Sequence, residues 1–192
     1  LSIRLSADGF SFSIYHPLIE NNSTYFTYPV NTSYSLTANL KEFINATDAL
    51  KHSYRKTNIL IDTQRFTLIP FELFEDENQD EFFHQNFPHK ENEIILCNIL
   101  GKSNVALLFG VNKHSHQLLN EHFPHAQFFS CVSPLLEHFS LKSREGNCRK
   151  LYVHLRENLL ETFVFDRGKL LLANNFPCKK TADRVYYLLY IL

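Results

Sequence analysis

The first part of the chain alternates apolar and polar positions in the way that strands do. The alternation runs through LSIRLSADGFSFSIY, on both sides of an Asp8-Gly9 pair that predicts a hairpin turn with positive φ. A third strand is expected over residues 23–30, and apolar positions at helical spacing predict a helix over residues 35–51. The predicted order is strand, strand, strand, helix.

The next part of the chain predicts two strands followed by an acidic helical segment. The strands are expected over residues 58–62 and 66–69, with Pro70 suited to the first turn of a helix. In the segment FELFEDENQDEFFHQNFP, phenylalanines can form one face while the acidic residues stay in water. The spacing of its carboxylates does not match a calcium loop, so this segment predicts a solvated helix.

From Glu91 the pattern changes to a second hairpin, EIILCNIL and VALLFGV joined by the turn GKSN. A helix capped by Asn112 follows, and a buried strand, HAQFFSCV, comes next. Ser133-Pro134 then predicts the start of a short helix, because serine caps helices well and proline is tolerated at the first position. Together these elements predict a compact β-β-α-β-α unit.

A polar stretch over residues 140–148 predicts a linker, after which the opening order returns. Strands are expected over residues 150–156, 159–165 and 169–176, with turns at Glu157-Asn158 and Arg167-Gly168. A helix from about Thr181 closes the set and is still apolar at Leu192. We therefore expect an internal duplication, in a chain that is itself a fragment of a longer protein.

The repetition divides the chain into three predicted parts. Residues 1–90 form a first half, residues 91–142 an inserted small subdomain, and residues 143–192 the start of an incomplete second half. The fold class that follows is α/β, with mixed sheets and duplicated β-β-β-α halves.

Composition narrows the classes of partner and compartment. The formal net charge of −1 gives no basic field for nucleic acid, and no apolar run reaches the ~18 residues of a membrane span. The beginning of the chain also lacks the order of a signal peptide. The four cysteines are far apart in sequence, which favours reduced thiols in a cytoplasmic protein.

Two successive β-β-β-α halves resemble the plan of the actin-like ATPase superfamily, which has a ribonuclease H-like fold. The segment from Glu93 to Ser140 looks like the extra subdomain of the pilus-assembly and cell-division branch of that superfamily. As a whole, the chain resembles an uncharacterised Bacteroidota family, a domain of unknown function within this superfamily. The likeness to the pilus-assembly branch implies that a groove between the first half and the inserted unit receives a peptide or another protein.

The same resemblance identifies two hairpins at which phosphates would be held. In catalytic members a strand ends in Asp-x-Gly, where glycine leaves room for phosphate beside the backbone. Here Asp8 directly precedes Gly9, and the second hairpin has His154 in place of the carboxylate and Arg156 in place of glycine. These four residues are the candidate cofactor-binding positions, in hairpins that we interpret as vestigial.

Other motifs do not support a catalytic or metal site. The GKS triplet at 101–103 resembles the end of a P-loop, but a strand follows where a helix is required. His114 and His116 would lie about 200° apart on a helix, so the histidine-rich segment predicts a helix surface. No serine, cysteine or lysine stands in a recognisable nucleophile motif. We predict neither a catalytic residue nor a metal ligand.

The sequence leaves two functional hypotheses. The first is a pseudo-ATPase, a non-catalytic protein or peptide interaction or assembly module with no cofactor, no nucleic acid and no membrane insertion. The alternative is a nucleotide-binding ATPase or a sugar-kinase-like phosphotransferase that uses ATP with Mg²⁺. The alternative needs carboxylates near the phosphates, for which Asp8 and Asp62 are the candidates.

Overall fold

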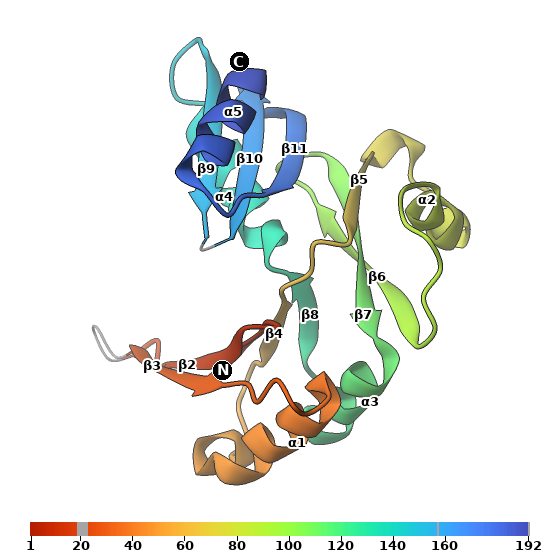
Figure 1. Cartoon of the computed structure of the whole chain (residues 1–192), viewed down its shortest axis with the longest axis vertical. Coiled ribbons are helices and arrows are strands. Elements are labelled where there is room, and N and C mark those ends of the chain that lie inside the picture. Colours follow the sequence, from red (N-terminus) through yellow and green to blue (C-terminus); the bar gives the residue numbers. More distant parts are fainter. Residues whose placement is uncertain (19–22, 157, 192) are drawn as a thin grey trace.

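The computed structural model describes residues 1–18, 23–156 and 158–191, which hold eleven strands in three sheets (Figure 1). One predicted turn includes Glu157, and the predicted last helix reaches Leu192. Both residues lie outside the described residues. The largest sheet has the order β3-β2-β1-β4-β8. Its strands are β1 (Ser2–Leu5), β2 (Gly9–Tyr15), β3 (Ser23–Pro29), β4 (Asn58–Ile61) and β8 (Gln127–Ser130).

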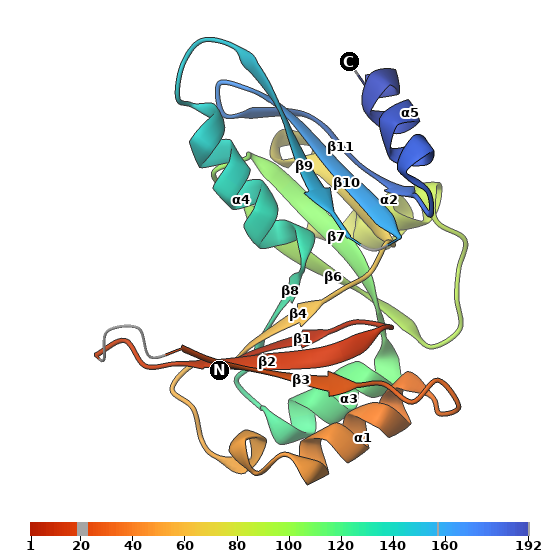
Figure 2. The ribbon, with the colours of Figure 1, turned by 60° about the vertical axis from the view of Figure 1, so that its left-hand side comes forward.

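Helices α1 (Leu36–Ala46) and α3 (Lys113–His122) cover one face of this sheet (Figure 2). Alternate strand residues such as Ile3 and Phe10 are buried with Phe43 of α1, as the period-two pattern predicts. The side chains of Ser35 and Asn112 cap the two helices by accepting backbone N–H groups in the first turn. The Asn112 cap and the burial of this helical face were both predicted correctly.

The second sheet has the order β5-β7-β6 and is packed against α2 (Gln79–Asn86). Its strands are β5 (Phe66–Pro70), β6 (Glu93–Leu100) and β7 (Val105–Asn112). Two 3₁₀ turns, Phe71–Leu73 and Asp76–Asn78, connect β5 to α2. The predicted hairpin of β6 and β7 is confirmed, and β7 is the buried central strand of this sheet.

The third sheet has the order β11-β10-β9, with α4 (Val132–Ser143) and α5 (Thr181–Ile191) on opposite faces (Figures 1 and 2). Its strands are β9 (Arg149–Leu155), β10 (Leu159–Asp166) and β11 (Lys169–Pro177). Arg167 and Gly168 have φ of 49° and 90°, the geometry of the predicted tight turn. The second succession of three strands and a helix, which the sequence predicted, is therefore present.

Two strand pairings cross the boundary predicted between residues 90 and 91. β8 lies within residues 91–142 but pairs in parallel with β4, and β5 lies within residues 1–90 but pairs with β7. The division into residues 1–90, 91–142 and 143–192 remains a prediction. Each of these two parts of the chain therefore contributes a strand to the sheet of the other.

Two predicted helix boundaries were wrong. α1 ends at Ala46, because Thr47 is extended (φ −106°, ψ 99°), and a separate 3₁₀ turn, Asp48–Lys51, follows. α4 begins at Val132, so Ser133 lies inside it, where its hydroxyl donates to Asn98 Oδ1 (2.7 Å) in place of capping the helix.

The predicted linker over residues 140–148 was wrong in its first half. α4 continues to Ser143, and both Ser140 and Ser143 are fully buried. Ser140 Oγ donates to the carbonyl of Gly168 (3.1 Å), and Ser143 Oγ accepts the N–H of Gly168 (2.9 Å). These hydrogen bonds attach the end of α4 to the β10–β11 turn, so the connection is a packed one.

Candidate functional site

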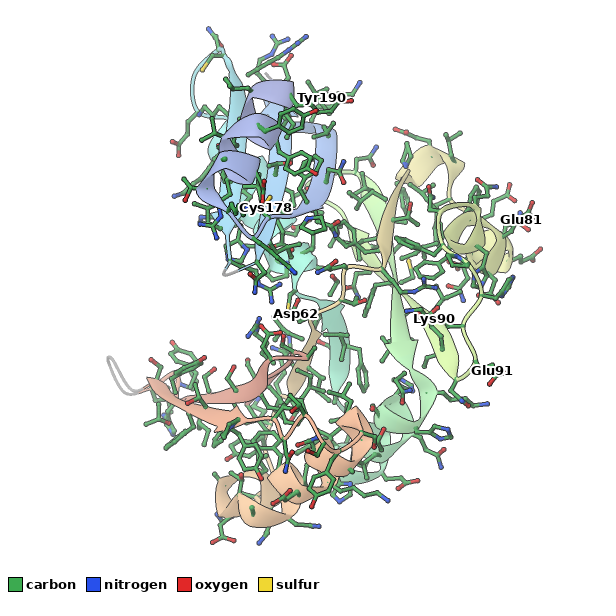
Figure 3. All side chains as sticks on the ribbon, viewed as in Figure 1. Asp62, Glu81, Lys90, Glu91, Cys178 and Tyr190 are labelled. Carbon is green, nitrogen blue, oxygen red and sulfur yellow. The ribbon has the colours of Figure 1, made fainter. Side chains whose placement is uncertain are left out.

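A cavity of about 610 Å³ lies where the two predicted phosphate hairpins approach each other. The first hairpin contributes its turn, residues 6–8, and the second contributes Arg156 and the start of β10. The segment after β4 (62–65) and Lys90 complete the lining. Figure 3 shows Asp62 at the junction of the elements that carry the two hairpins. Both hairpins at which the resemblance would place phosphates therefore border one cavity.

Asp62 is the centre of this site. Its carboxylate accepts Arg156 Nη1 (2.6 Å) at Oδ1, and both Arg156 Nη2 and Arg4 Nη2 bond to its Oδ2. The Asp62 side chain is only 8% exposed. A bidentate guanidinium and a second arginine together satisfy a buried carboxylate, which would be costly if left without a partner.

The strands fix all three of these side chains. Asp62 comes directly after β4, and its N–H donates to the carbonyl of Leu5 (2.9 Å) at the end of β1. Arg4 lies on β1, in parallel register with β4. Arg156 comes directly after β9, where its N–H donates to the carbonyl of Leu159 (2.9 Å). The ion pair therefore joins the sheet that contains β1 and β4 to the sheet that contains β9.

The protonation of Arg156 reflects this partner. Burial lowers the pKa of its guanidinium, but the hydrogen bonds and charge of Asp62, with smaller contributions from Glu161 and Asp8, raise it above the ordinary value. Arg156 is thus a permanent cation whose donors are already directed at a carboxylate.

Asp8 lines this cavity but lies outside the Asp62–Arg156 pair. Its side chain is 78% exposed, its Oδ1 accepts the hydroxyl of Ser6 (3.1 Å), and its Oδ2 is 4.0 Å from Arg156 Nη2. The prediction that Asp8-Gly9 forms a turn with positive φ was wrong. The turn comprises residues 6–8, closed by the Ser6 N–H donating to the carbonyl of Gly9 (3.2 Å).

Gly9 is the first residue of β2 and pairs with Pro29 of β3. A Cβ at this position would lie 3.3 Å from the carbonyl oxygen of Tyr28, so close passage of β3 gives a structural reason for glycine. Gly9 is not among the described residues that line the cavity. Its part in cofactor binding remains a prediction.

His154 points to a neighbouring strand. Its Nδ1 is 2.6 Å from Oε2 of Glu161, its cross-strand partner on β10, and Glu161 is buried. His154 does not line the cavity as far as the structure describes it. Of the four predicted positions, the structure brings only Asp8 and Arg156 together with Asp62.

Arg4, Arg65 and Lys90 were not predicted as site residues. Arg65 is held by Glu93 through Nε (2.8 Å) and Nη2 (2.7 Å), and its guanidinium lies 5.0 Å from the centroid of the Phe87 ring. Arg4 occupies an ordinary polar position in the alternation of β1, on the face opposite to Ile3 and Leu5, so no local signal in the sequence marked it. Its distance along the chain from Asp62 hid the contact.

Cys131 lies at the start of α4, near this cluster, but is not an activated nucleophile. Burial, followed by the negative charge of Asp62, raises the pKa of its thiol to about 12. The thiol of Cys97 is raised to about 11, again mainly by burial. The four cysteines are free thiols in the described residues.

Iodoacetamide at pH 8 is therefore expected to alkylate exposed Cys148 well before Cys97 or Cys131, because thiolate is the reacting species. Peptide mass spectrometry over a time course measures the order, and the same reaction in denaturant is the control, in which all four should react alike. Modification of Cys131 as fast as Cys148 would contradict this assignment.

A second cavity, of about 430 Å³, lies between the first sheet and the inserted hairpin. Leu60 and Phe129 line it from the first sheet, Ile99 and Leu100 from β6, and Pro134 from α4. This is the region in which the resemblance implied a peptide groove. Its role as a peptide groove stays a prediction.

The histidine-rich helix has structural contacts. His122 Nδ1 lies 2.9 Å from the carbonyl of Leu118, and the ring of His116 packs on Phe128 at 4.5 Å between centroids. Across residues 1–18, 23–156 and 158–191, no three His, Cys, Asp or Glu side chains are grouped to hold a metal ion. No helix in the same residues is long and apolar enough to span a bilayer.

Solved structures and a protein family identify the fold. A crystal structure from Bacteroides thetaiotaomicron, of a protein with an actin-like ATPase fold and unknown function, has a TM-score of 0.92 and 51% identity, covering 99% of this chain and 74% of that one. A chain of the PilM–PilN type IV pilus biogenesis complex has a TM-score of 0.53 and 12% identity, covering 99% and 65%. No curated protein matches.

These likenesses show an α/β chain with an actin-like ATPase fold, as the two hairpin-led series of elements indicated. The more distant pilus protein supports the same fold at low identity. Residues 1–192 match the family described as "Protein of unknown function (DUF3822)", and the chain belongs to that family.

Proposed function

We propose that this chain is a non-catalytic, actin-like protein that acts as an interaction or assembly module for a protein or peptide partner. The observation that carries the proposal is the cluster of Asp62 with Arg4 and Arg156, the Asp62 cluster, in the cavity between the hairpins. Arg156 stands where catalytic relatives of this fold would have a glycine, and its donors are engaged by Asp62. A triphosphate entering there would have to displace a buried ion pair.

The backbone around the cavity supports the same proposal. A phosphate nest needs consecutive N–H groups that no side chain crowds, usually through glycine with positive φ. The described glycines with positive φ are Gly146 and Gly168, and neither lines this cavity. The first hairpin turn contains Ala7 and Asp8, with side chains where a nest would be open.

The context of the proposal is a partner in the cytoplasm. Four free thiols fit a reducing compartment, and a net charge of −1 does not favour nucleic acid. A solved chain of the same fold comes from the PilM–PilN complex, which is compatible with an assembly role. The cavity between the first sheet and β6 offers one apolar surface for such a partner.

The alternative is a nucleotide-binding ATPase or sugar-kinase-like phosphotransferase with Mg²⁺. It is favoured by one observation: Asp8, an exposed carboxylate, lines the same cavity as Asp62. Carboxylates near phosphates can hold Mg²⁺ directly or through water.

We expect millimolar MgATP to leave the melting temperature of the chain unchanged. A nucleotide at about 100 times its dissociation constant would add about 2.7 kcal/mol, or roughly 5–11 °C for a chain of this size. Differential scanning fluorimetry measures the shift in separate samples with ATP and Mg²⁺, with ADP and Mg²⁺, and with Mg²⁺ alone. A rise of that size that disappears in Asp8→Ala would establish the ATPase alternative in place of our proposal.

A further inference from the structure

Two sheet edges face each other across a single groove. β5 is an edge strand of the second sheet, and β11 is an edge strand of the third. Figure 1 shows β5 and β11 beside each other, and Asn175 of β11 bonds to the carbonyl of Gln64 just before β5. A groove of about 610 Å³, separate from the Asp62 cavity, is lined by β5 and the end of α2 on one side and by β11 on the other. Its volume falls within the range of ligand-binding pockets.

The groove is lined by the edges of the strands. Six consecutive residues of β11, 170–175, border it, although alternate residues of a strand point to opposite faces. All six can line one groove only if the groove runs along the edge of the strand. The N–H of Asn175 is accepted by the side chain of Asn174 (2.8 Å), which is the kind of local partner that an unpaired edge group takes.

The β11 edge lacks the usual protection against another strand. Natural edges are blunted by charged side chains, as at β9, which begins with Arg149 and Lys150 on the opposite edge of the same sheet. After Lys169, β11 reads LLLANNFP without a charge, and Leu171 and Leu172 are 45% and 38% exposed. A β-bulge at Leu171 limits the regular edge to residues 172–177.

The β5 side has matching chemistry. Phe66, Thr67 and Leu68 line the groove without a charged side chain, and the rest of the lining adds none. Asn175 Nδ2 donates to the carbonyl of Gln64 (3.2 Å) and joins the two sides at one end. From that contact, β5 runs along the groove towards its C-terminal end, and β11 runs along it towards its N-terminal end. The groove therefore has one closed end, and the two strand edges form its walls.

We propose that this groove binds an extended, uncharged peptide segment of a partner protein, which adds as a strand to the edge of β11 beside β5. The inference rests on the proposed interaction function and specifies the class of partner. Main-chain hydrogen bonds to β11 give the affinity, and apolar side chains of the peptide contact Leu172 and the β5 wall. The uncharged lining favours an uncharged segment, because a charge placed there would lose water without gaining a partner.

A library of random twelve-residue peptides displayed on phage, selected on the immobilised chain, tests the proposal. We expect enrichment of uncharged sequences with alternating apolar residues. The enriched peptide, synthesised with a fluorophore, should slow amide hydrogen exchange within residues 170–176 when bound. Methylation of alternate peptide amides, which removes main-chain donors, should weaken its binding by at least about tenfold.

Matched variants locate the site. Leu172→Lys places a charge on the β11 edge and is expected to weaken peptide binding by about tenfold or more, as measured by fluorescence polarisation. Val153→Lys introduces the same charge at an apolar residue of similar exposure (37% against 38%) on β9, the other edge of this sheet, and should leave binding unchanged. Circular dichroism of both variants confirms that they fold.

Three results would overturn the inference. One is a library that yields no binder, and another is a binder that is indifferent to Leu172→Lys or to amide methylation. The third is a concentration-dependent dimer, seen by sedimentation and lost in Leu172→Lys, which would show that the edge pairs with a second copy of the chain. MgATP binding alone would overturn the proposed function but leave a peptide result standing, so the two failures are distinguishable.

Discussion

Replacing Asp62 with asparagine is expected to lower the free energy of unfolding by about 3 kcal/mol, because it leaves two arginines without their carboxylate. The change is nearly isosteric, so the loss is one of charge and of acceptors for Arg4 and Arg156. For a chain of this size the melting temperature should fall by roughly 6–12 °C. Urea unfolding followed by circular dichroism measures the free energy directly.

Asp48→Asn is the matched control for this experiment. Asp48 also pairs with a cation, Lys51 Nζ at 2.7 Å, but its side chain is 91% exposed. Exposed pairs contribute little, so the free energy of unfolding is expected to stay unchanged within the error of the measurement there. Equal effects of the two substitutions would mean that the Asp62 cluster does not hold the first and third sheets together, and would contradict the proposal that its ion pair keeps nucleotide out of the cavity.

The parts of the fold that the sequence predicted well are those set by neighbouring residues. The hairpin turn at Arg167-Gly168 follows from a dipeptide that accepts positive φ, and the Asn112 cap follows from one side chain and the helix after it. Apolar periodicity located all five α-helices and all eleven strands of the described residues, with errors at their ends.

The parts that were missed depend on contacts between distant residues. The stretch from Ser140 to Cys148 is polar and reads as a linker, but the hydroxyls of Ser140 and Ser143 are satisfied by Gly168, 28 and 25 residues away. Ser133 was expected to cap a helix because its hydroxyl often does so. Here that hydroxyl is engaged by Asn98, 35 residues earlier in the chain.

The candidate site shows the same division. Asp8 and Arg156 could be predicted as neighbours, because the resemblance assigned both to hairpins that face one cleft. The Asp62–Arg156 pair could not, since its partners are 94 residues apart and no local pattern links them. His154 shows the opposite case: its Glu161 partner is seven residues away across a hairpin, and cross-strand register alone explains the contact.

Asn98 is expected to be a second position of large effect, because it joins β6 to β8 and α4. Its Oδ1 accepts the N–H of Ser130 (2.9 Å) and the hydroxyl of Ser133 (2.7 Å), and its Nδ2 donates to the carbonyl of Phe128 (2.9 Å). Ser130 and Ser133 are almost completely buried. Substitution of Asn98 by leucine would keep the volume but leave these groups without partners, at a cost of about 3–4 kcal/mol.

Urea unfolding of Asn98→Leu, with Asn120→Leu on α3 as the control, measures that cost. Among the described residues, Asn120 bonds only to the ring of His116, one helical turn earlier, so its replacement should change stability by less than about 0.5 kcal/mol. Hydrogen exchange at the Ser130 N–H should accelerate in Asn98→Leu before the rest of β8 does, because that group loses its acceptor. Unchanged exchange there would mean that β4 pairing alone holds β8, and that the inserted sheet is attached to the first sheet by packing without this polar junction.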